Sequence, residues 1–384
     1  MPIYINNPIL STSIFIVIFV FVLLISIRRK EKHELFSLEL TRELKGLAIL
    51  AIIFSHVGYF LSDNHNFLFP LSIMAGVGVN LFLFLSGYGL TISSLKEKLQ
   101  ISEFYEKRLL RLFVPFWIIL IIFFLLDFFL LHISYSSTYI LKTLFGFFGS
   151  ADLFTDIDSP LWFFTQILFY YLVFPLLFLR KHSWFTAILV YISSYFILQL
   201  NLPVTESVFH LYQLHMLAFP LGVAVASLFS KSSVWLPIIL NKIKKLNIFW
   251  NNLRIMKHVI YYGVLTALLI LVGYTAYYSG VGESLWKEQL ISLVTMSAVI
   301  FLFSLKKFEI KAFSLFGLYA YEVYLLHWPL VSRYDFFFKF FPGWLAMVLH
   351  LILILFLAWL LVKIQNRIHQ IKMPHKILES ERGI

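Results

Sequence analysis

The sequence predicts an all-α protein, a polytopic transmembrane helical bundle of about 11 spans with its N-terminus outside and its C-terminus inside the cell. Three observations carry this prediction. The 384 residues are 60% hydrophobic and only 13% charged, whereas a soluble domain has about 25% charged residues. Apolar runs long enough to cross a bilayer, which takes ~20 residues, follow one another along the whole chain. The basic residues gather on alternate connections between these runs.

The apolar runs divide the chain into connections that alternate between the two sides of a membrane. With the N-terminus outside, all but four of the 31 lysines and arginines fall on the cytoplasmic side. This excess is the positive-inside pattern. It explains the net charge of +11 by contact with anionic membrane lipid rather than nucleic acid. The runs lie near residues 9–27, 44–62, 73–94, 112–133, 161–179, 184–200, 210–229, 258–279, 288–305, 316–333 and 344–363.

The chain divides into three predicted regions. Residues 1–32 form an additional N-terminal transmembrane anchor helix, because the basic residues follow its apolar run and no signal-peptide cleavage site is evident. Residues 33–370 form a ten-span membrane domain, and residues 371–384 form a short cytoplasmic tail. The chain has no cysteine, which excludes disulfides, cysteine-ligated metals and thiol nucleophiles.

A polar stripe on the second run is the sharpest functional signal. Lys45 and His56 are eleven positions apart, which on a helix is three turns plus about 20°, so both lie on one face. They are separated by ~16 Å along the axis, and Arg42 lies close to the same stripe. The stripe suits a shaft with a cationic mouth for an anionic ligand and a base deeper inside. The structural alternative is a snorkelling lysine and a histidine satisfied by a neighbouring helix.

Arg108 and Arg111 form a second candidate site just before the fourth run. They are three residues apart and share a helix face, and guanidinium groups bind phosphate oxygens bidentately. The alternative is ordinary positive-inside anchoring.

The tenth run contains Glu322, Tyr324 and His327, polar groups that are unfavourable at membrane depth unless they have partners. Tyr324 and His327 share a face. Trp328 beside them could be an interfacial belt residue. Weaker candidates are the polar residues Asp127, His132, Gln166, His210 and His215.

No metal site is expected. The acids Asp152, Asp156 and Asp158 in the outer loop 134–160 could bind a cation, but a solvated loop is the favoured interpretation.

These segments, in this order, resemble the membrane acyltransferase 3 family of bacterial integral-membrane O-acetyltransferases of cell-surface glycans. The resemblance covers residues 40–365. It rests on Lys45-Gly46-Leu47 through His56, the run Gly76 to Tyr88, the run Phe104 to Trp117, Leu161-Trp162-Phe163-Phe164 and the run Tyr321 to Pro329. His56 matches the family histidine and Arg108 and Arg111 match its R-x-x-R pair, whereas Lys45 stands where arginine is usual.

The resemblance implies transfer of an acyl group, by expectation acetyl, from cytoplasmic acetyl-CoA to a hydroxyl of a cell-surface polysaccharide or its lipid-linked precursor, in the bacterial cytoplasmic membrane. Arg108, Arg111, Lys45 and Arg42 would neutralise the coenzyme A phosphates. His56 would act as general base or carry the acyl group covalently, with Glu322 or Asp127 orienting its imidazole. The residues Trp162, Tyr324 and His327 would contact the substrate.

Two other classes of function compete with this one. A midplane histidine and glutamate also suit a proton-coupled transporter or exporter of a glycan or small molecule, although no inverted repeat is detectable. A receptor would need a signalling segment, and none is evident. The sequence leaves the acceptor and the oligomeric state open, with a homodimer among the options.

Overall fold

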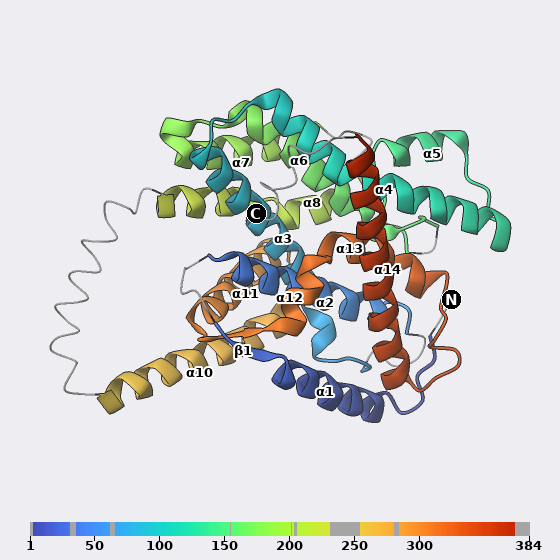
Figure 1. Ribbon diagram of the computed structural model, residues 1–384, viewed down its shortest axis with the longest axis horizontal. Coiled ribbons are helices and arrows are strands. Elements are labelled where there is room, and N and C mark those ends of the chain that lie inside the picture. The colour runs from blue at the N-terminus through green and yellow to red at the C-terminus, as the bar shows by residue number, and fades with distance from the viewer. Residues whose placement is uncertain are drawn as a thin grey trace.

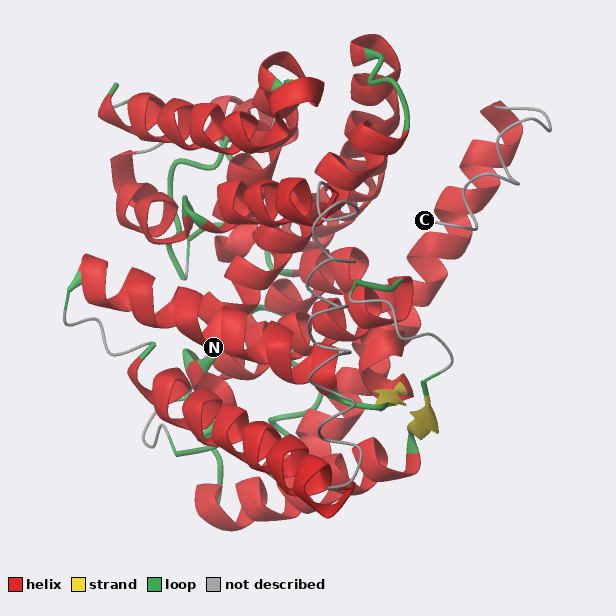
Figure 2. Cartoon of the chain, turned by 90° about the vertical axis from the view of Figure 1, so that its left-hand side faces the viewer, coloured by secondary structure: helices red, strands yellow, loops and turns green. Residues whose placement is uncertain are grey.

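The computed structural model confirms the all-α prediction. It describes residues 3–30, 36–61, 66–153, 155–200, 202, 206–230, 254–279 and 284–372. Most of this part of the chain is helical, and one pair of short antiparallel strands accompanies the helices (Figure 2). The elements are α1 (Pro8–Ile25), β1 (Ile27–Arg29), α2 (Leu38–Gly58), α3 (Ala75–Lys96), α4 (Ile101–Leu130), α5 (Ser137–Leu144), α6 (Trp162–Leu177), α7 (Ser183–Gln199), α8 (Phe209–His215), α10 (Arg254–Tyr278), α11 (Leu285–Leu305), β2 (Phe308–Ile310), α12 (Lys311–Leu318), α13 (Ala320–Ser332) and α14 (Gly343–Lys372).

Every apolar run that the sequence analysis identified contains helix, but the boundaries differ in informative places. The predicted span 316–333 is two helices, α12 and α13, that meet at Tyr319. The fourth helix begins at Ile101, so Arg108 and Arg111 lie inside it rather than before it. The run 210–229 is α8 followed by a second helix over residues 218–230. The predicted tail 371–384 lies outside the described residues beyond position 372.

Eight helical segments are long and apolar enough to cross a membrane: Pro8–Ile25, Ala75–Lys96, Ile101–Leu130, Ser159–Leu177, Phe209–Ser230, His258–Tyr278, Leu285–Leu305 and Gly343–Arg367. The others miss this standard for visible reasons. Helix α7 has 17 residues and α13 has 13, and α2 carries four charged residues in its first half. The count of eleven spans and the orientation of the termini therefore stay predictions.

Two of the helices that miss this standard, α2 and α13, lie at the centre of the protein. Figure 1 shows α2 and α13 in the middle of the bundle, with α1 and α10 along one edge. Helix α13 buries twelve of its 13 residues, and α2 packs against α3, α11, α12 and α13. Few side chains of α1 and α10 are buried, as expected for surfaces that lipid covers.

Helix α2 begins at a cap that its sequence encodes. Ser37 is the N-cap, and its hydroxyl accepts a hydrogen bond from the Leu40 amide at 3.2 Å, which satisfies one of the free N–H groups of the first turn. Glu39 in that turn interacts favourably with the positive end of the helix dipole.

Two glycines let α2 and α12 approach to backbone contact. A Cβ atom on Gly46 would lie 1.8 Å from the Phe313 carbonyl oxygen, and one on Gly317 would lie 1.8 Å from that of Arg42. Small residues at such crossings allow close helix packing. The contact holds the segment that carries Lys45 firmly against α12.

Candidate active site

A cavity of about 470 Å³ lies between α2, α3, α4, α6 and α13, and we call it the central cavity. Its volume is in the range of small-molecule and cofactor sites, ~300–1,000 Å³. Residues from six separate stretches of sequence line it, including Lys45, His56, Phe82, Ser86, Arg108, Arg111, Pro160, Trp162, Phe163, Ile167, Tyr171, Tyr321, Glu322, Tyr324 and Gln365. The fold thus brings most of the sequence-predicted site residues to one space.

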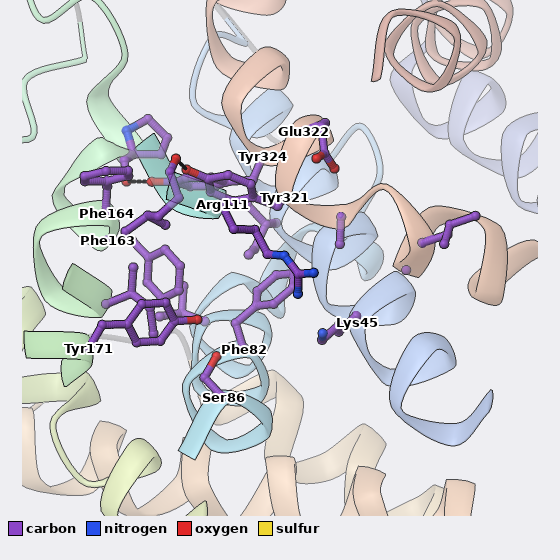
Figure 3. Close-up of a pocket in the computed structure, with 18 of the residues that line it drawn as sticks. Lys45, Phe82, Ser86, Arg111, Phe163, Phe164, Tyr171, Tyr321, Glu322 and Tyr324 are labelled. Carbon is purple, nitrogen blue, oxygen red and sulfur yellow. Dashed lines mark hydrogen bonds between the residues drawn. The ribbon is translucent and has the colours of Figure 1, made fainter. Parts of the chain in front are cut away.

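One end of the cavity is basic, and we call it the cationic end. Arg108 and Arg111 reach it from one face of α4, and Lys45 reaches it from α2. Figure 3 shows the side chains of Arg111 and Lys45 directed into the same space, with Tyr171 and Ser86 on another wall. Such a cluster offers several charged donors to an anion.

Two further predicted residues lie at or beside this end. Glu322 lines the cavity together with Gln365 of α14, and it interacts electrostatically with Arg111 and Lys45. Arg42 lies one helical turn before Lys45 and is not among the residues that line the cavity.

His56 reaches the cavity from α2 and forms a pair with a second histidine. Its Nδ1 lies 2.8 Å from Nε2 of His327 on α13, and the two rings are nearly parallel at 5.0 Å. Nδ1 of His327 lies 2.7 Å from the Tyr324 carbonyl oxygen, which can only accept. His327 therefore carries its proton on Nδ1, and in the neutral ring its Nε2 accepts. It follows that His56 donates from Nδ1 and keeps an unprotonated Nε2.

Aromatic packing fixes the orientation of this pair. The ring of Trp328 meets that of His56 edge to face at 5.0 Å and lies against Phe60 at 4.9 Å. Trp328 is 1% exposed, so it packs in the interior and is not an interfacial belt residue. The His56 side chain is half-buried, and it lines the central cavity.

The groups first considered as orienting His56 have other partners. The Asp127 carboxylate pairs with Arg333 at 2.5 Å and accepts hydrogen bonds from the hydroxyls of Tyr135 and Tyr334. His327, which the sequence analysis expected to contact the substrate, is the hydrogen-bond partner of His56. No sequence signal links positions 56 and 327, because the contact depends on how α2 crosses α13.

Tyr324 and Trp162 both line the cavity. The Tyr324 hydroxyl donates to the Pro160 carbonyl at 2.8 Å, which ties α13 to the start of α6. Trp162 stacks on His215 at 5.6 Å. His215 is 3% exposed, and its Nδ1 lies 2.8 Å from Asn80 Oδ1.

Sequence reasoning missed Ser86, Tyr171 and Gln365 as cavity residues. The first two lie within segments that were already noted for other reasons, whereas Gln365 carried a signal that was overlooked. It is a polar side chain near the end of an apolar helix, two residues past the predicted boundary at 363.

The acids of the outer loop are structural, and the solvated-loop interpretation is wrong for two of the three. Asp156 is 9% and Asp158 4% exposed. The Asp156 carboxylate accepts hydrogen bonds from the Ser150 hydroxyl and the Asp152 amide. Burial raises the pKa of Asp158 well above its ordinary value. Among the described residues, no cluster of histidines and acids could hold a metal ion.

The comparisons with known proteins agree with this arrangement. A family model, that of the acyltransferase domain, matches residues 44–363, which includes both histidines of the pair and all three cations that line the cavity. No curated protein and no solved structure matches the chain. Because the match spans most of the sequence and includes in full six of the eight helical segments long enough to cross a membrane, the chain belongs to the acyltransferase 3 family of multi-pass membrane proteins.

Proposed function

We propose that this acyltransferase moves an acyl group, acetyl in the first instance, from acyl-coenzyme A to a hydroxyl of a cell-surface glycan or its lipid-linked precursor. The single observation that carries the proposal is the His56–His327 pair, whose unprotonated nitrogen belongs to a residue lining a cavity with a cationic end. The proposed setting is a bacterial cytoplasmic membrane, with the cationic end facing the cytoplasm.

The donor's anionic part is matched by the cationic end. Coenzyme A carries several phosphate groups, and Arg108, Arg111 and Lys45 would bind them while the pantetheine arm extends toward His56. Glu322 lies beside these cations. It would repel a phosphate placed too close, so we assign it to positioning the donor rather than to the chemical step.

The acyl transfer follows from the protonation pattern of the pair. Nε2 of His56 takes the proton of the acceptor hydroxyl as its oxygen attacks the thioester carbonyl carbon. The carbon–sulfur bond then breaks, and the leaving thiolate takes that proton from Nε2, so the products are an ester and the free thiol. His327 accepts a hydrogen bond from Nδ1 of His56 throughout, and so stabilises the imidazolium that forms between the two proton transfers. The covalent alternative, an acyl-His56 intermediate, would use the same nitrogen.

The donor role of the cationic end can be tested with the purified protein in lipid nanodiscs. We expect the wild type to release free thiol from acetyl-CoA without any ion gradient. In Arg111→Ala the apparent KM for acetyl-CoA should rise roughly tenfold or more, since a charged hydrogen bond contributes ~1.5–3 kcal/mol. The matched control is Lys107→Ala, because Lys107 is half exposed and pairs with Glu103. An unchanged KM in Arg111→Ala would count against the phosphate role, and a dependence on a gradient would favour a transporter.

A further inference from the structure

Two hydroxyl groups that face the central cavity have no partner in the described part of the chain. Ser86 on α3 and Tyr171 on α6 are half-buried and line the cavity. No hydrogen bond joins either hydroxyl to a described residue, and neither oxygen is enclosed by the surrounding protein. Figure 3 shows both side chains directed into the cavity. A ligand in the cavity can therefore reach both hydroxyls.

The other two tyrosines that line the cavity differ from Tyr171 in this respect. The Tyr321 hydroxyl donates to the Leu112 carbonyl at 2.6 Å. The Tyr324 hydroxyl donates to the Pro160 carbonyl at 2.8 Å. Both hydroxyls thus connect helices of the bundle, whereas the Tyr171 hydroxyl makes no such connection within the described residues.

Ser86 also differs from the usual serine inside a helix. Such a serine often donates to the carbonyl four residues earlier, as Ser194 does to the Val190 carbonyl at 2.9 Å. Ser86 makes no such bond to the Phe82 carbonyl, and its side chain is directed into the cavity instead. Its proton is available to a ligand.

Packing brings the two hydroxyls to the same depth in the bundle. A Cβ atom on Gly87, next to Ser86, would lie 2.3 Å from the Phe219 carbonyl oxygen. The ring of Tyr170, next to Tyr171, stacks on the Phe219 ring at 4.3 Å. The neighbours of Ser86 and Tyr171 therefore contact the same residue, which holds α3 and α6 level with each other at this point.

Each hydroxyl follows two apolar residues on one face of its helix. The spacing i, i+3, i+7 places such residues on a single face, and it occurs in both helices: Val79, Phe82 and Ser86 on α3, and Phe164, Ile167 and Tyr171 on α6. Lys45 and Arg111 are directed into the cavity from other walls. The cationic end thus has charged groups on one side and two neutral hydroxyl donors on another.

A phosphate ester held at this end needs donors from more than one direction, because its oxygens are arranged tetrahedrally. The oxygens turned toward Lys45 and Arg111 receive charged donors. The oxygens turned toward α3 and α6 lose their water when the ligand enters, and an acceptor left without a donor is unfavourable. The hydroxyls of Ser86 and Tyr171 can donate to these oxygens.

We propose that Ser86 and Tyr171 complete the binding site for a phosphate ester of the acyl donor, each hydroxyl donating to a phosphate oxygen that Lys45 and Arg111 do not reach. In coenzyme A, this phosphate joins the pantetheine arm to the nucleotide. The inference rests on the proposed function, in which coenzyme A carries the acyl group. It assigns to these two residues the selection of a phosphorylated donor.

The test measures the dissociation constants of phosphopantetheine and pantetheine by displacement of coenzyme A from the full-length protein in nanodiscs. The wild type should bind phosphopantetheine more tightly than pantetheine. In Tyr171→Phe and in Ser86→Ala, phosphopantetheine binding should weaken roughly tenfold, the effect of one hydrogen bond to a charged group, while pantetheine binding stays the same. The apparent KM for acetyl-CoA should rise by a similar factor in both variants.

Two hydroxyls of α7 provide matched controls. Tyr195→Phe and Ser193→Ala each remove one hydroxyl from a residue that does not line the central cavity, and both should leave the binding of the two ligands unchanged.

The outcomes separate this assignment from the proposed function. Equal weakening of both ligands in Tyr171→Phe or Ser86→Ala would show that the side chain only shapes the cavity, and unchanged binding would show that its hydroxyl makes no bond to the donor. Either result overturns the assignment alone, as would a wild type that binds coenzyme A without favouring phosphopantetheine over pantetheine. A wild type that binds no coenzyme A would instead refute the donor in the proposed function, and the assignment with it.

Discussion

His56 and His215 are two histidines with nearly the same surroundings and different relations to the central cavity. Each lies against a tryptophan ring, Trp328 in one case and Trp162 in the other. Each makes a 2.8 Å hydrogen bond through Nδ1, to an imidazole for His56 and to the Asn80 amide oxygen for His215. His56 lines the cavity, whereas His215 is 3% exposed and does not.

A shared tautomer and a shared tryptophan contact therefore do not separate the two histidines. Asn80 donates its amide N–H to the Ser292 hydroxyl at 2.7 Å, so its oxygen is free to accept, and His215 also carries its proton on Nδ1. Both rings thus present an unprotonated Nε2. Access to a substrate-sized space is what separates them, so the two should respond to substitution in opposite ways.

The largest expected effect is on catalysis at His56. His56→Ala should reduce acyl transfer per folded protein by roughly 10²–10⁴-fold, the range that general acid–base catalysis contributes. Product ester and free thiol are measured at matched protein levels, with His215→Ala as the control. Undiminished transfer in His56→Ala would refute the central claim of the proposed function.

His327 should show a smaller catalytic effect, because it acts through His56 as a positioning residue. His327→Leu removes the acceptor for the Nδ1 proton and should lower kcat by roughly 10²-fold, with KM for the donor little changed. His327→Gln offers an amide oxygen in its place and should recover part of the loss. Equal kcat values in the two variants would indicate that His327 only fills space.

His215 should affect stability rather than catalysis. In His215→Ala the Asn80 oxygen loses its donor while still buried, which costs ~1–3 kcal/mol, and Trp162 loses its stacking partner. We expect a lower melting temperature in nanodiscs and a kcat per folded protein within a few-fold of the wild type. A large loss of kcat at full stability would remove the distinction between the two histidines.

The smallest effect tests a buried carboxyl group, Asp158, which lies outside the cavity. Its pKa is raised in the folded protein, so the folded state binds more protons than the unfolded state above the ordinary pKa of ~3.9. Stability should therefore be greatest below that pH and fall as pH rises toward the raised value, by at most about 1.4 kcal/mol per pH unit. In Asp158→Asn this dependence should be absent; thermal melts over a pH series would reveal it, and parallel curves for both proteins would contradict the assignment.

Much of the site could be predicted from sequence because it follows from local periodicity. Lys45 and His56 share a face of one helix, and Arg108 and Arg111 share a face of another, and both relations depend only on spacing. The role considered for Asp127, orienting the imidazole of His56, could not be judged from spacing. Its partner Arg333 lies 206 residues away, and no local pattern joins the two positions.

The sequence by itself determined the class of the protein, its helices and its family, because apolar length and helical spacing are local properties of the chain. Only the tertiary structure decided which histidine faces the cavity, which nitrogen stays unprotonated and which polar groups are paired. Those outcomes depend on contacts between α2 and α13 and on the glycine crossing of α2 with α12. Such contacts arise from packing between helices distant in sequence, and the free energy that selects them is shared among many residues at once.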